Sequence, residues 1–409
     1  MNIMHIGMIL TAPFPPDIRV EKEARSLIKA GFQVSLLCST RESPYIREEI
    51  VQGIHVKRIN VTDTFDGIFW ALIFTRLHLY EIFFANIYWR KEVLNYARER
   101  DVDALHLHDL TVAKDVLWVG RLLKIPVILD FHENFPIGIQ STAVELNKNW
   151  LWKHFFYKLK RWKRYESISA GRAHKVIAVI EEMKQRLLND YGLPGDKIVV
   201  VPNTEDKDYF LQFDINPEIV RKNGSECLTI GYIGSYSWHR GLDVIIDAVY
   251  QLKSELNIQF LIVGRGAAHN KLQMQVESLK LTDRVKFIGW QPFEKVPSFI
   301  AACDVCVVPH HSTVQTEAGA PHKLFQYMLM KKPILVSNCA ALKRIIEETQ
   351  SGLVFQAGNS KDAARCLLQL QDEKLRKQLG ENGYCSAMEK YNWEITSQGL
   401  IEIYNQLER

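Results

Sequence analysis

The sequence lacks any long hydrophobic segment. Its most apolar window, at 67–75, has nine residues, whereas a helix that spans a bilayer needs about 20. The apolar run at the N-terminus has no basic residue before it and soon meets Pro13 and Asp17, so we interpret it as a first β-strand and not as a signal peptide. The sequence therefore predicts a protein that does not cross a membrane.

A strong excess of one charge is also lacking. The 409 residues include 51 Lys and Arg against 47 Asp and Glu, which gives a net charge of +4. This balance is too mild to indicate nucleic-acid binding. Hydrophobic residues make up 47% of the chain, and low-complexity tracts and repeats of solenoid length are missing. The composition is thus typical of globular domains, and the length favours two or three of them.

A disulfide pattern is missing as well. The seven cysteines are odd in number and scattered, and a chain of this size buries a core without disulfides, so we expect a reducing cytoplasm. Cys303 and Cys306 stand where a helix end is expected to run into a strand, which favours core packing over zinc or redox chemistry. His106 and His108 have a spacing that can share a metal, but no third ligand is evident in the sequence. We therefore expect no metal site.

Short β-branched runs alternate with amphipathic helical stretches along the whole chain, which indicates parallel sheets covered by helices on both faces. Strands are expected at 3–10, 33–38, 54–58, 104–107, 127–130, 176–179, 198–201, 228–233, 259–263, 285–288, 305–308, 334–336 and 353–355. A polar stretch at 204–226, with Pro and Gly, interrupts the alternation and is interpreted as a linker. The expected fold is α/β, with two Rossmann-like domains at 1–203 and 227–388 whose parallel sheets face each other across a cleft. For a C-terminal helix at 389–409 both domains are open, and packing back on the N-terminal domain is one expectation.

Polar residues follow several of the expected strands, where ligands bind in open parallel sheets. In the first half, the loop after the first strand has prolines in place of a glycine fingerprint, and Asp17 is placed to cap the next helix. Arg19 lies just inside that helix, where it lines a cleft or is solvated on the helix face. His132 and Glu133 come directly after the strand at 127–130, where a ligand-binding role and a structural histidine are both open.

The second half offers three further loops. Gly234 and Ser235 end a strand shortly before Arg240 opens a helix, and backbone N–H groups with an arginine suit a diphosphate. Gly264 and Gly266 form a tight turn after the next strand but only a weak dinucleotide fingerprint. The last loop starts a helix whose first turns carry His322, Lys323, Leu324 and Gln326. There Lys323 can neutralise a phosphate and Gln326 can bond a ribose edge. All four are candidate donor-binding residues, and an ordinary amphipathic helix with Leu324 turned inward is the alternative.

These motifs, taken in order, resemble a known family. The segment PHKLFQYM followed by KPILVS resembles the donor-nucleotide segment of retaining family-4 glycosyltransferases of the GT-B fold. The remaining motifs are similar to that family in the family's own order: PPDIRVEKEARSLIKAGFQVSLLC, DFHENFP, VVVPN, IGYIGSYSWHRGLDVIIDAV and LIVGRG. The resemblance covers nearly the whole chain and implies an acceptor-binding first domain and a donor-binding second domain.

The resemblance also implies roles for single residues. His132 lies beside the donor sugar, and Arg240 grips the leaving diphosphate together with Lys323. Gln326 stands where many relatives have the second Glu of a paired-Glu motif, and Glu317 is a candidate for the first, although eight residues separate the two. Ser235 stands where the commonest pattern has an arginine. Asp17, Arg19 and Glu133 fall on the acceptor side.

The implied reaction is transfer of a sugar, with retention, from a UDP- or GDP-linked nucleotide sugar to a glycan or lipid-linked acceptor in bacterial surface-polysaccharide synthesis. No carboxylate is well placed as a nucleophile, which favours front-face departure and attack without a metal or cofactor. A nucleotide-sugar epimerase of the same fold and a non-catalytic nucleotide-sugar-binding protein remain alternatives.

The stretch at 148–165 combines seven Lys and Arg with seven aromatic residues and no acid. On a helix, one face carries Trp152, Phe156 and Trp162, and the other carries the basic residues Lys153, Lys160, Arg161 and Arg164. This pattern is typical of a helix that lies on an anionic membrane, although a helix packed on its own sheet with a solvated basic side has the same pattern. We expect peripheral attachment to the inner face of the cell membrane and a polyprenyl-diphosphate-linked acceptor.

Overall fold

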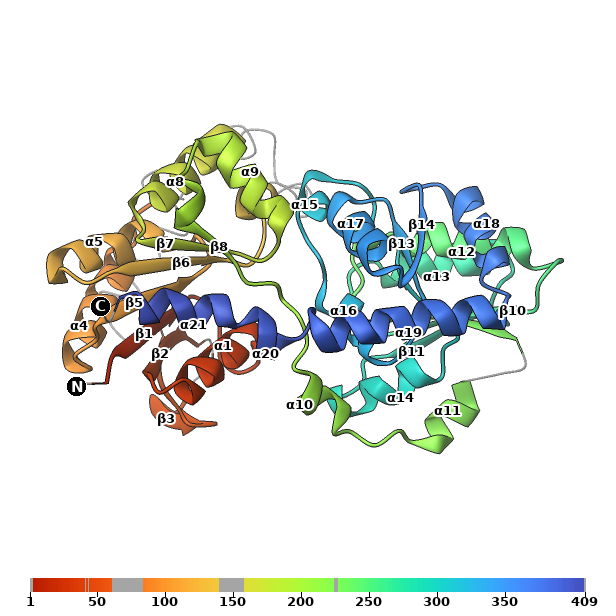
Figure 1. Ribbon diagram of the computed structural model, residues 1–409, viewed down its shortest axis with the longest axis horizontal. Coiled ribbons are helices and arrows are strands. Elements are labelled where there is room, and N and C mark those ends of the chain that lie inside the picture. The colour runs from red at the N-terminus through yellow and green to blue at the C-terminus, as the bar shows by residue number, and fades with distance from the viewer. Residues whose placement is uncertain are drawn as a thin grey trace. The chain divides into compact units, whose positions relative to one another are not determined.

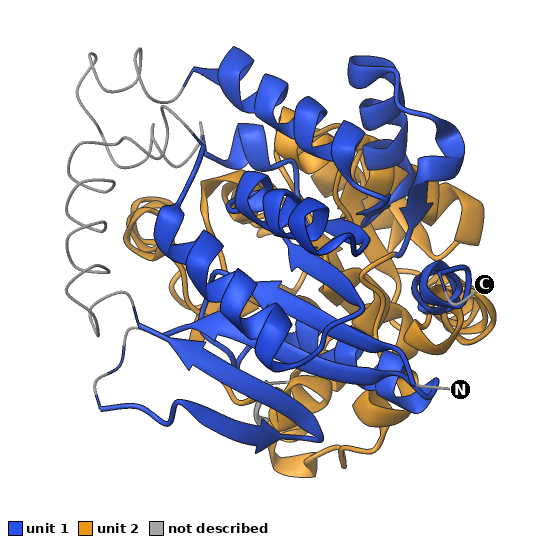
Figure 2. Cartoon of the chain, turned by 90° about the vertical axis from the view of Figure 1, so that its left-hand side faces the viewer, with its two compact units in different colours: residues 1–201, 397–409 blue, residues 202–396 orange. Residues whose placement is uncertain are grey.

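The computed structural model describes residues 3–40, 42, 44–60, 84–139, 158–223 and 227–407. The chain divides into two compact units, coloured separately in Figure 2. Unit 1 comprises residues 1–201 and 397–409, and unit 2 comprises residues 202–396. Each unit is a largely parallel sheet with helices packed against it, so the expected α/β class with two Rossmann-like domains is confirmed.

Unit 1 contains an eight-stranded sheet in the order β3-β4-β2-β1-β5-β6-β7-β8 (Figure 1). All neighbouring strands are parallel except β3, which pairs antiparallel with β4 at the edge. The strands are β1 His5–Leu10, β2 Gln33–Ser39, β3 Glu48–Val51, β4 Ile54–Ile59, β5 Ala104–His108, β6 Val127–Phe131, β7 Lys175–Ala178 and β8 Ile198–Val200. The helices are α1 Ile18–Lys29, α4 Ile87–Glu99, α5 Ala113–Leu123, α8 Leu159–Arg172, α9 Glu181–Tyr191 and α21 Gln398–Asn405.

Unit 2 contains a six-stranded parallel sheet in the order β11-β10-β9-β12-β13-β14, the strand order of dinucleotide-binding Rossmann domains. The strands are β9 Leu228–Ile233, β10 Ile258–Val263, β11 Val285–Gly289, β12 Val305–Val308, β13 Ile334–Ser337 and β14 Gly352–Phe355. The helices are α10 Lys207–Leu211, α11 Pro217–Asn223, α12 Leu242–Leu252, α13 His269–Ser278, α14 Val296–Ala301, α15 Val314–Glu317, α16 His322–Leu329, α17 Ala340–Thr349, α18 Ser360–Gln369, α19 Glu373–Glu389 and α20 Trp393–Thr396.

The central strands of both sheets are buried along their whole length. Every residue of β1, β5 and β6 in unit 1 and of β9, β10 and β12 in unit 2 is buried. Apolar side chains on both faces of such strands require helices on both sides. Cys303 and Cys306 belong to this core at 2% and 0% exposure, as expected from the sequence.

Two parts of the expected organisation differ in the structure. The stretch at 204–226, interpreted as a linker, contains α10 and α11 and belongs to unit 2. α10 packs against α16, and α11 packs against α14. The C-terminal helix expected at 389–409 is divided: α19 and α20 end in unit 2, whereas α21 belongs to unit 1 and packs against α1 and β8.

No helix among the described residues is long and apolar enough to cross a membrane.

Candidate functional site

The first group of candidate residues gathers at one edge of the sheet in unit 2. The strand order reverses between β9 and β12, and ligands of open α/β sheets bind outside the carboxyl ends of strands at such a reversal. Gly234 follows β9, and His310 follows β12. The loop after β9 runs through a short 3₁₀ turn, Trp238–Arg240, into α12.

Glycines let the backbone loops of this edge approach one another closely. A Cβ atom on Gly264 would lie 2.1 Å from the carbonyl oxygen of Gly234, and one on Gly266 would lie 1.8 Å from that of Tyr236. Gly241 has φ +67°, and its Cβ would meet the Pro309 carbonyl oxygen at 1.9 Å. These loops therefore require glycine for close packing as well as for backbone freedom.

Two basic side chains converge on this edge. The ammonium of Lys323, on the first turn of α16, lies 3.5 Å from the ring centre of Tyr232, and a Cβ on Gly234 would lie 2.6 Å from its Nζ. Nη1 of Arg240 lies 2.9 Å from Nε2 of His310. Nε of Arg240 and Nδ1 of the buried His310 have no hydrogen-bond partner among the described residues. The edge therefore presents donors that an anionic ligand can satisfy.

The pKa values of this cluster also favour an anionic ligand. Burial, with the nearby charge of Arg240, holds the pKa of Lys323 well below its usual range. Burial and the same arginine also hold the pKa of His310 well below its usual range and lower the pKa of His239 to about 4. Like charges crowded in a buried place disfavour their own protonation. A diphosphate would relieve this repulsion.

The starts of two helices add backbone donors. Neither α12, which follows Gly241, nor α16, which follows Pro321, has a side chain that caps its first N–H groups. Because a helix N-terminus carries a partial positive charge, it favours an anion. Unit 2 therefore combines two cations and two uncapped helix starts, without a carboxylate bonded to Arg240 or Lys323 among the described residues.

Gln326 lies one turn further along α16 and is engaged by a carboxylate that we did not expect. Its Nε2 donates to Oε2 of Glu205 over 2.7 Å, and Nε2 of His322 lies 3.1 Å from the same oxygen. Glu205 is 1% exposed and lies in the stretch interpreted as a linker. This acceptor holds the amide so that the oxygen Oε1 of Gln326 is left to accept from a ligand hydroxyl.

The remaining candidates in unit 2 have local structural contacts. Ser235 is exposed, and its carbonyl oxygen accepts from the Tyr232 hydroxyl over 2.7 Å. Leu324 is fully buried, as the alternative of an ordinary amphipathic helix requires, and its part in donor binding stays a prediction. Glu317 accepts from the Ser312 hydroxyl over 2.6 Å and from the backbone N–H of Ala340, at the start of α17, over 2.7 Å. This capping role occupies both carboxylate oxygens, and the catalytic role of Glu317 stays a prediction.

In unit 1, His132 follows β6 and belongs to a dense network of charges. Its Nε2 lies 2.7 Å from Oδ2 of Asp130, and its Nδ1 lies 4.0 Å from a carboxylate oxygen of Asp109. Asp130 in turn accepts two hydrogen bonds, of 3.0 and 2.9 Å, from the guanidinium of Arg19. Arg19 also donates to the carbonyl oxygen of Val201 over 3.1 Å. His132, at 18% side-chain exposure, and Asp109, at 31%, are the members of this network that reach the surface.

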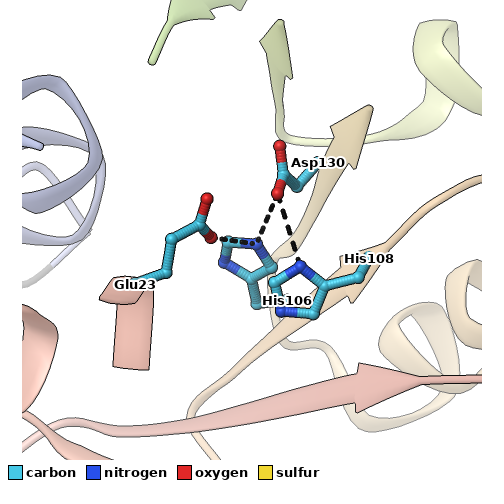
Figure 3. A group of neighbouring side chains, drawn as sticks. All are labelled: Glu23, His106, His108 and Asp130. Atoms are coloured by element: carbon cyan, nitrogen blue, oxygen red, sulfur yellow. Dashed lines mark hydrogen bonds and ion pairs between the residues drawn. The ribbon is translucent and has the colours of Figure 1, made fainter. Parts of the chain in front are cut away.

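Four residues beneath His132 complete the network: Glu23, His106, His108 and Asp130 (Figure 3). The sheet register places His108 beside Asp130 on neighbouring strands, and Nδ1 of His108 lies 3.3 Å from Oδ2 of Asp130. Nε2 of His106 lies 3.3 Å from Glu23, and its Nδ1 lies 2.7 Å from the Tyr404 hydroxyl of α21. The C-terminal helix therefore closes the network from the side of α1.

The protonation states follow from burial and neighbouring charge. Burial alone would lower the pKa of His132, but the carboxylates of Asp130 and Asp109 outweigh it and raise the pKa to about 9. Burial would raise the pKa of Asp130, but Arg19 and His132 hold it well below its usual range. Burial raises the pKa of Glu23 to about 8 and lowers that of His108 to about 3. At neutral pH, His132 is thus an imidazolium on an ionised aspartate.

The same four residues have the donor set of a metal site. Their ligand atoms lie within 4.8 Å of one another, so the third and fourth ligands that the sequence did not show are present. However, the guanidinium of Arg19 is hydrogen-bonded to Asp130 and lies 2.9 Å from Glu23, which places a positive charge beside both carboxylates. A divalent cation there would be repelled. The donor set therefore fits a buried hydrogen-bonded network better than a metal ion.

We expect this network to make stability fall as the pH rises. The folded-state pKa of His132, about 9, exceeds its ordinary value of 6.5. The folded protein therefore keeps a proton that the unfolded chain has released, and the stabilisation present below pH 6.5 is lost as the pH rises through 9. In denaturant unfolding, the free energy of unfolding by which the wild type exceeds His132→Gln should shrink by at most about 3 kcal/mol between pH 6.5 and 9.5. An advantage that is equal at both pH values would contradict the raised pKa.

The three residues expected on the acceptor side have different surroundings in the structure. The Asp17 side chain caps α1 by accepting from the N–H groups of Arg19 and Val20, each over 3.1 Å, as the sequence predicted. Glu133 is exposed. Arg19, which we expected in a cleft or on a solvated helix face, is only 5% exposed and is bound to Asp130 and Glu23. The alternative of a solvated helix face is wrong for Arg19, because it considered the helix without the neighbouring strand, and its place on the acceptor side stays a prediction.

The expected membrane-surface residues are described only in part. Trp152, Lys153 and Phe156 lie outside the described residues. Lys160 and Arg164 are exposed on α8, and the guanidinium of Arg161 lies 5.5 Å from the ring centre of Phe84. Trp162 is 1% exposed and packs near Phe84 and Phe135. In the described part of this stretch, the aromatic face thus packs inside unit 1, and the basic face is outside.

Two Rossmann-like α/β units, each a parallel or largely parallel sheet with helices packed against it, define the class of proteins with the GT-B fold. HepE of Anabaena, solved in complex with UDP-glucose, has this fold in common with the chain, with a TM-score of 0.72, 17% identity and coverage of 98% of this chain and 100% of that one.

The comparisons with known proteins identify the family. Residues 18–209 match the model of Glycosyltransferase Family 4, and residues 216–385 match that of Glycosyl transferases group 1. An uncharacterized glycosyltransferase of Methanocaldococcus jannaschii is 26% identical over 318 residues, which cover 76% of this chain and 78% of the relative. The phosphatidyl-myo-inositol mannosyltransferase of Mycobacterium leprae is 23% identical over 307 residues, with coverage of 74% and 73%. The chain belongs to the group 1 glycosyltransferases of the GT-B fold.

Proposed function

We propose that this glycosyltransferase transfers a sugar, with retention and without a metal, from a UDP- or GDP-linked sugar to a lipid-linked glycan acceptor in bacterial surface-polysaccharide synthesis. Binding of the donor is supported by the pair Arg240 and Lys323, which lies where the strand order of the unit 2 sheet reverses. The unpartnered Nε of Arg240 and Nδ1 of His310 support it, because buried donors without a partner are costly unless a ligand satisfies them.

In the proposed reaction, the cations of unit 2 stabilise the charge that develops on the leaving diphosphate. No metal is needed for this step if Arg240, Lys323 and the two helix starts supply the positive charge. The bond from the anomeric carbon to the diphosphate oxygen breaks, and the bond to the acceptor oxygen forms on the same face. The acceptor proton passes to the departing diphosphate, so that charge and atoms balance.

A front-face path is favoured by the carboxylates near His132. A covalent glycosyl-enzyme needs a carboxylate that reaches the sugar. Asp130 and Glu23 are fully buried and contact Arg19, and Asp109 is paired with His132. In our proposal, the His132 imidazolium donates a hydrogen bond to the donor sugar and holds it in place, and Asp130 positions the ring.

The lipid-linked acceptor and the peripheral attachment to the cytoplasmic leaflet are supported by unit 1. Lys160 and Arg164 on α8 are exposed, and an anionic membrane attracts each such charge by about 1 kcal/mol. The similarity to a phosphatidyl-myo-inositol mannosyltransferase adds a relative whose acceptor, by its name, is a lipid.

A charge exchange tests the role of Glu205 and Gln326 in donor binding. We expect Gln326→Glu alone to weaken the binding of the nucleoside diphosphate by about 10- to 100-fold, because two carboxylates would then face each other in a buried place. The double variant Glu205→Gln and Gln326→Glu keeps one carboxylate and one amide, and it should restore affinity to within about threefold. Calorimetric titration with UDP and GDP measures both. If the single and the double variant lose the same affinity for the nucleoside diphosphate, the pairing of Glu205 with Gln326 does not matter for donor binding.

The experiment that tests the proposal as a whole is a mass-spectrometric assay of purified protein with nucleotide sugars and a lipid-linked glycan acceptor. The proposal predicts release of nucleoside diphosphate that depends on the acceptor, and a product whose anomeric configuration matches that of the donor. A product of opposite configuration would exclude retention and leave the transferase assignment intact.

A further inference from the structure

A pocket with a volume of about 440 Å³ lies in unit 1, separate from the histidine network, and its lining includes Arg161 and Arg164 of the expected membrane surface. It is formed by α5, α8 and the start of α4, and we call it the α5–α8 pocket. Its lining residues are Phe84, Arg90, Lys114, Leu117, Trp118, Arg121, Arg161, Arg164, Tyr165, Ile168, Ser169 and Arg172. Six of these are basic and none is acidic, so the lining favours an anion.

Several of these charges have no carboxylate to balance them. Arg90 is paired with Asp115 at 2.8 Å. By contrast, no carboxylate in the part of the chain that the structure describes forms an ion pair with Arg121, Arg164 or Arg172, and all three are exposed. Like charges that crowd around one pocket repel each other until an anion occupies it.

The pocket also has an apolar wall. Trp118 and Ile168 are 41% and 42% exposed, and both line the pocket together with Phe84 and Leu117. The guanidinium of Arg90 lies 5.0 Å from the ring centre of Trp118. A small soluble anion would leave this wall in water, whereas a phosphate that carries a hydrocarbon chain would cover it.

A second hollow continues the first one along the same helices. It has a volume of about 290 Å³, shares Leu117, Arg121 and Arg172 with the α5–α8 pocket, and adds Lys124 and His174. The basic surface therefore extends from the start of α5 to its end.

The floor of the α5–α8 pocket is tied to the loops that follow β5 and β1. The Tyr165 hydroxyl accepts from the backbone N–H of Lys114 over 2.9 Å and donates to the carbonyl oxygen of Thr111. The hydroxyls of Thr111 and Thr11 are 2.8 Å apart. These loops lie at the same edge of the sheet as His132, since the strands are parallel. A lipid bound in the pocket would therefore be held near the edge assigned to the acceptor.

We infer that the α5–α8 pocket binds the phosphate group of an anionic membrane lipid, with the lipid chain against Trp118 and Ile168. This inference rests on the proposed function only for the identity of the lipid as acceptor or anchor. The binding itself depends on unit 1 alone, so it can be tested without donor or transfer.

The test is flotation with vesicles of phosphatidylcholine alone, with added phosphatidylglycerol, or with added polyprenyl phosphate. The full-length wild type should bind both anionic vesicles. The variant Arg121→Glu, Arg164→Glu and Arg172→Glu should bind them at least about 10-fold more weakly, since each basic residue contributes about 1 kcal/mol at such a surface. The matched control Lys29→Glu, Arg47→Glu and Arg98→Glu changes the same charge at exposed positions of unit 1 and should bind within about threefold of the wild type.

Two further measurements separate the sources of the ligand. A preference for polyprenyl phosphate over phosphatidylglycerol assigns the pocket to an isoprenoid lipid, and equal binding assigns it to membrane phosphates in general. Inorganic diphosphate that binds as tightly as a short-chain lipid phosphate would show a free-phosphate site and overturn the inference. The inference would also be overturned if the triple variant bound vesicles as well as the wild type does. It would be overturned too if the control variant lost vesicle binding to the same extent as the triple variant. If the protein binds vesicles through the pocket but transfers no sugar, the proposed function is refuted and the inference about the pocket remains.

Discussion

Replacing Arg240 with alanine is expected to lower kcat/KM for the nucleotide sugar by about 10²- to 10³-fold. The guanidinium lies beside His310 and belongs to the cluster that lowers the pKa of Lys323. Its loss removes a charge that stabilises the leaving diphosphate more in the transition state than in the bound donor. We therefore expect kcat to fall along with the affinity for the donor.

Steady-state kinetics with a defined donor and acceptor measure this effect. The matched control is Arg365→Ala, which removes an exposed arginine from α18 whose partner is Asp362, and it should change kcat/KM by less than about threefold. If Arg240→Ala keeps more than about a third of wild-type kcat/KM, the diphosphate cluster is misassigned.

Replacing His132 with alanine is expected to lower kcat by about 10²- to 10³-fold, with little change in the affinity for the nucleoside diphosphate. The imidazolium, whose pKa is raised to about 9, is assigned to the sugar and not to the diphosphate. The fall should therefore be seen in kcat, while titration with the nucleoside diphosphate stays unchanged.

The matched control is His174→Ala, because His174 is an exposed histidine of unit 1. Asp130→Asn should lower kcat as well, since Asp130 holds the His132 ring at 2.7 Å, and it should shift the alkaline limb of the pH profile to lower pH. Transfer by His132→Ala at a rate within about threefold of the wild type would remove His132 from the mechanism.

The sequence predicted the strands well because most of them are buried on both faces. Each of the expected strands is present with ends within two residues. β3 was missed because EEIV is short and half exposed at a sheet edge, where no apolar run is needed. The stretch at 204–226 was misread because its Pro, Gly and polar residues are typical of loops, yet two short helices there pack on unit 2.

The grouping of Arg240, Lys323 and Gln326 was easier to predict than the histidine network for a physical reason. Lys323 and Gln326 lie on one helix, and Arg240 shortly precedes another, so local patterns indicate that all three lie at the starts of helices. Glu205 is 121 positions from Gln326, and Glu23 reaches His106 only because α1 packs over β5. Such contacts depend on tertiary packing and have no signal in local spacing.

The basic surface of the α5–α8 pocket could not be predicted from the sequence alone. The sequence showed the basic face of 148–165, but Arg121, Lys124 and Arg172 add to it from positions that are not contiguous in the chain. Their common surface arises because α5 and α8 pack side by side.

The central claim, that unit 2 holds a nucleotide sugar for transfer, is tested most directly by incubating the wild type and Arg240→Ala with a panel of nucleotide sugars, with and without lipid-linked acceptor. Mass spectrometry then follows the nucleoside diphosphate and the sugar. The account predicts that one donor yields nucleoside diphosphate in an acceptor-dependent manner, and that Arg240→Ala abolishes most of this release. A change of the sugar without release of nucleoside diphosphate, or binding without turnover in every combination, would contradict it.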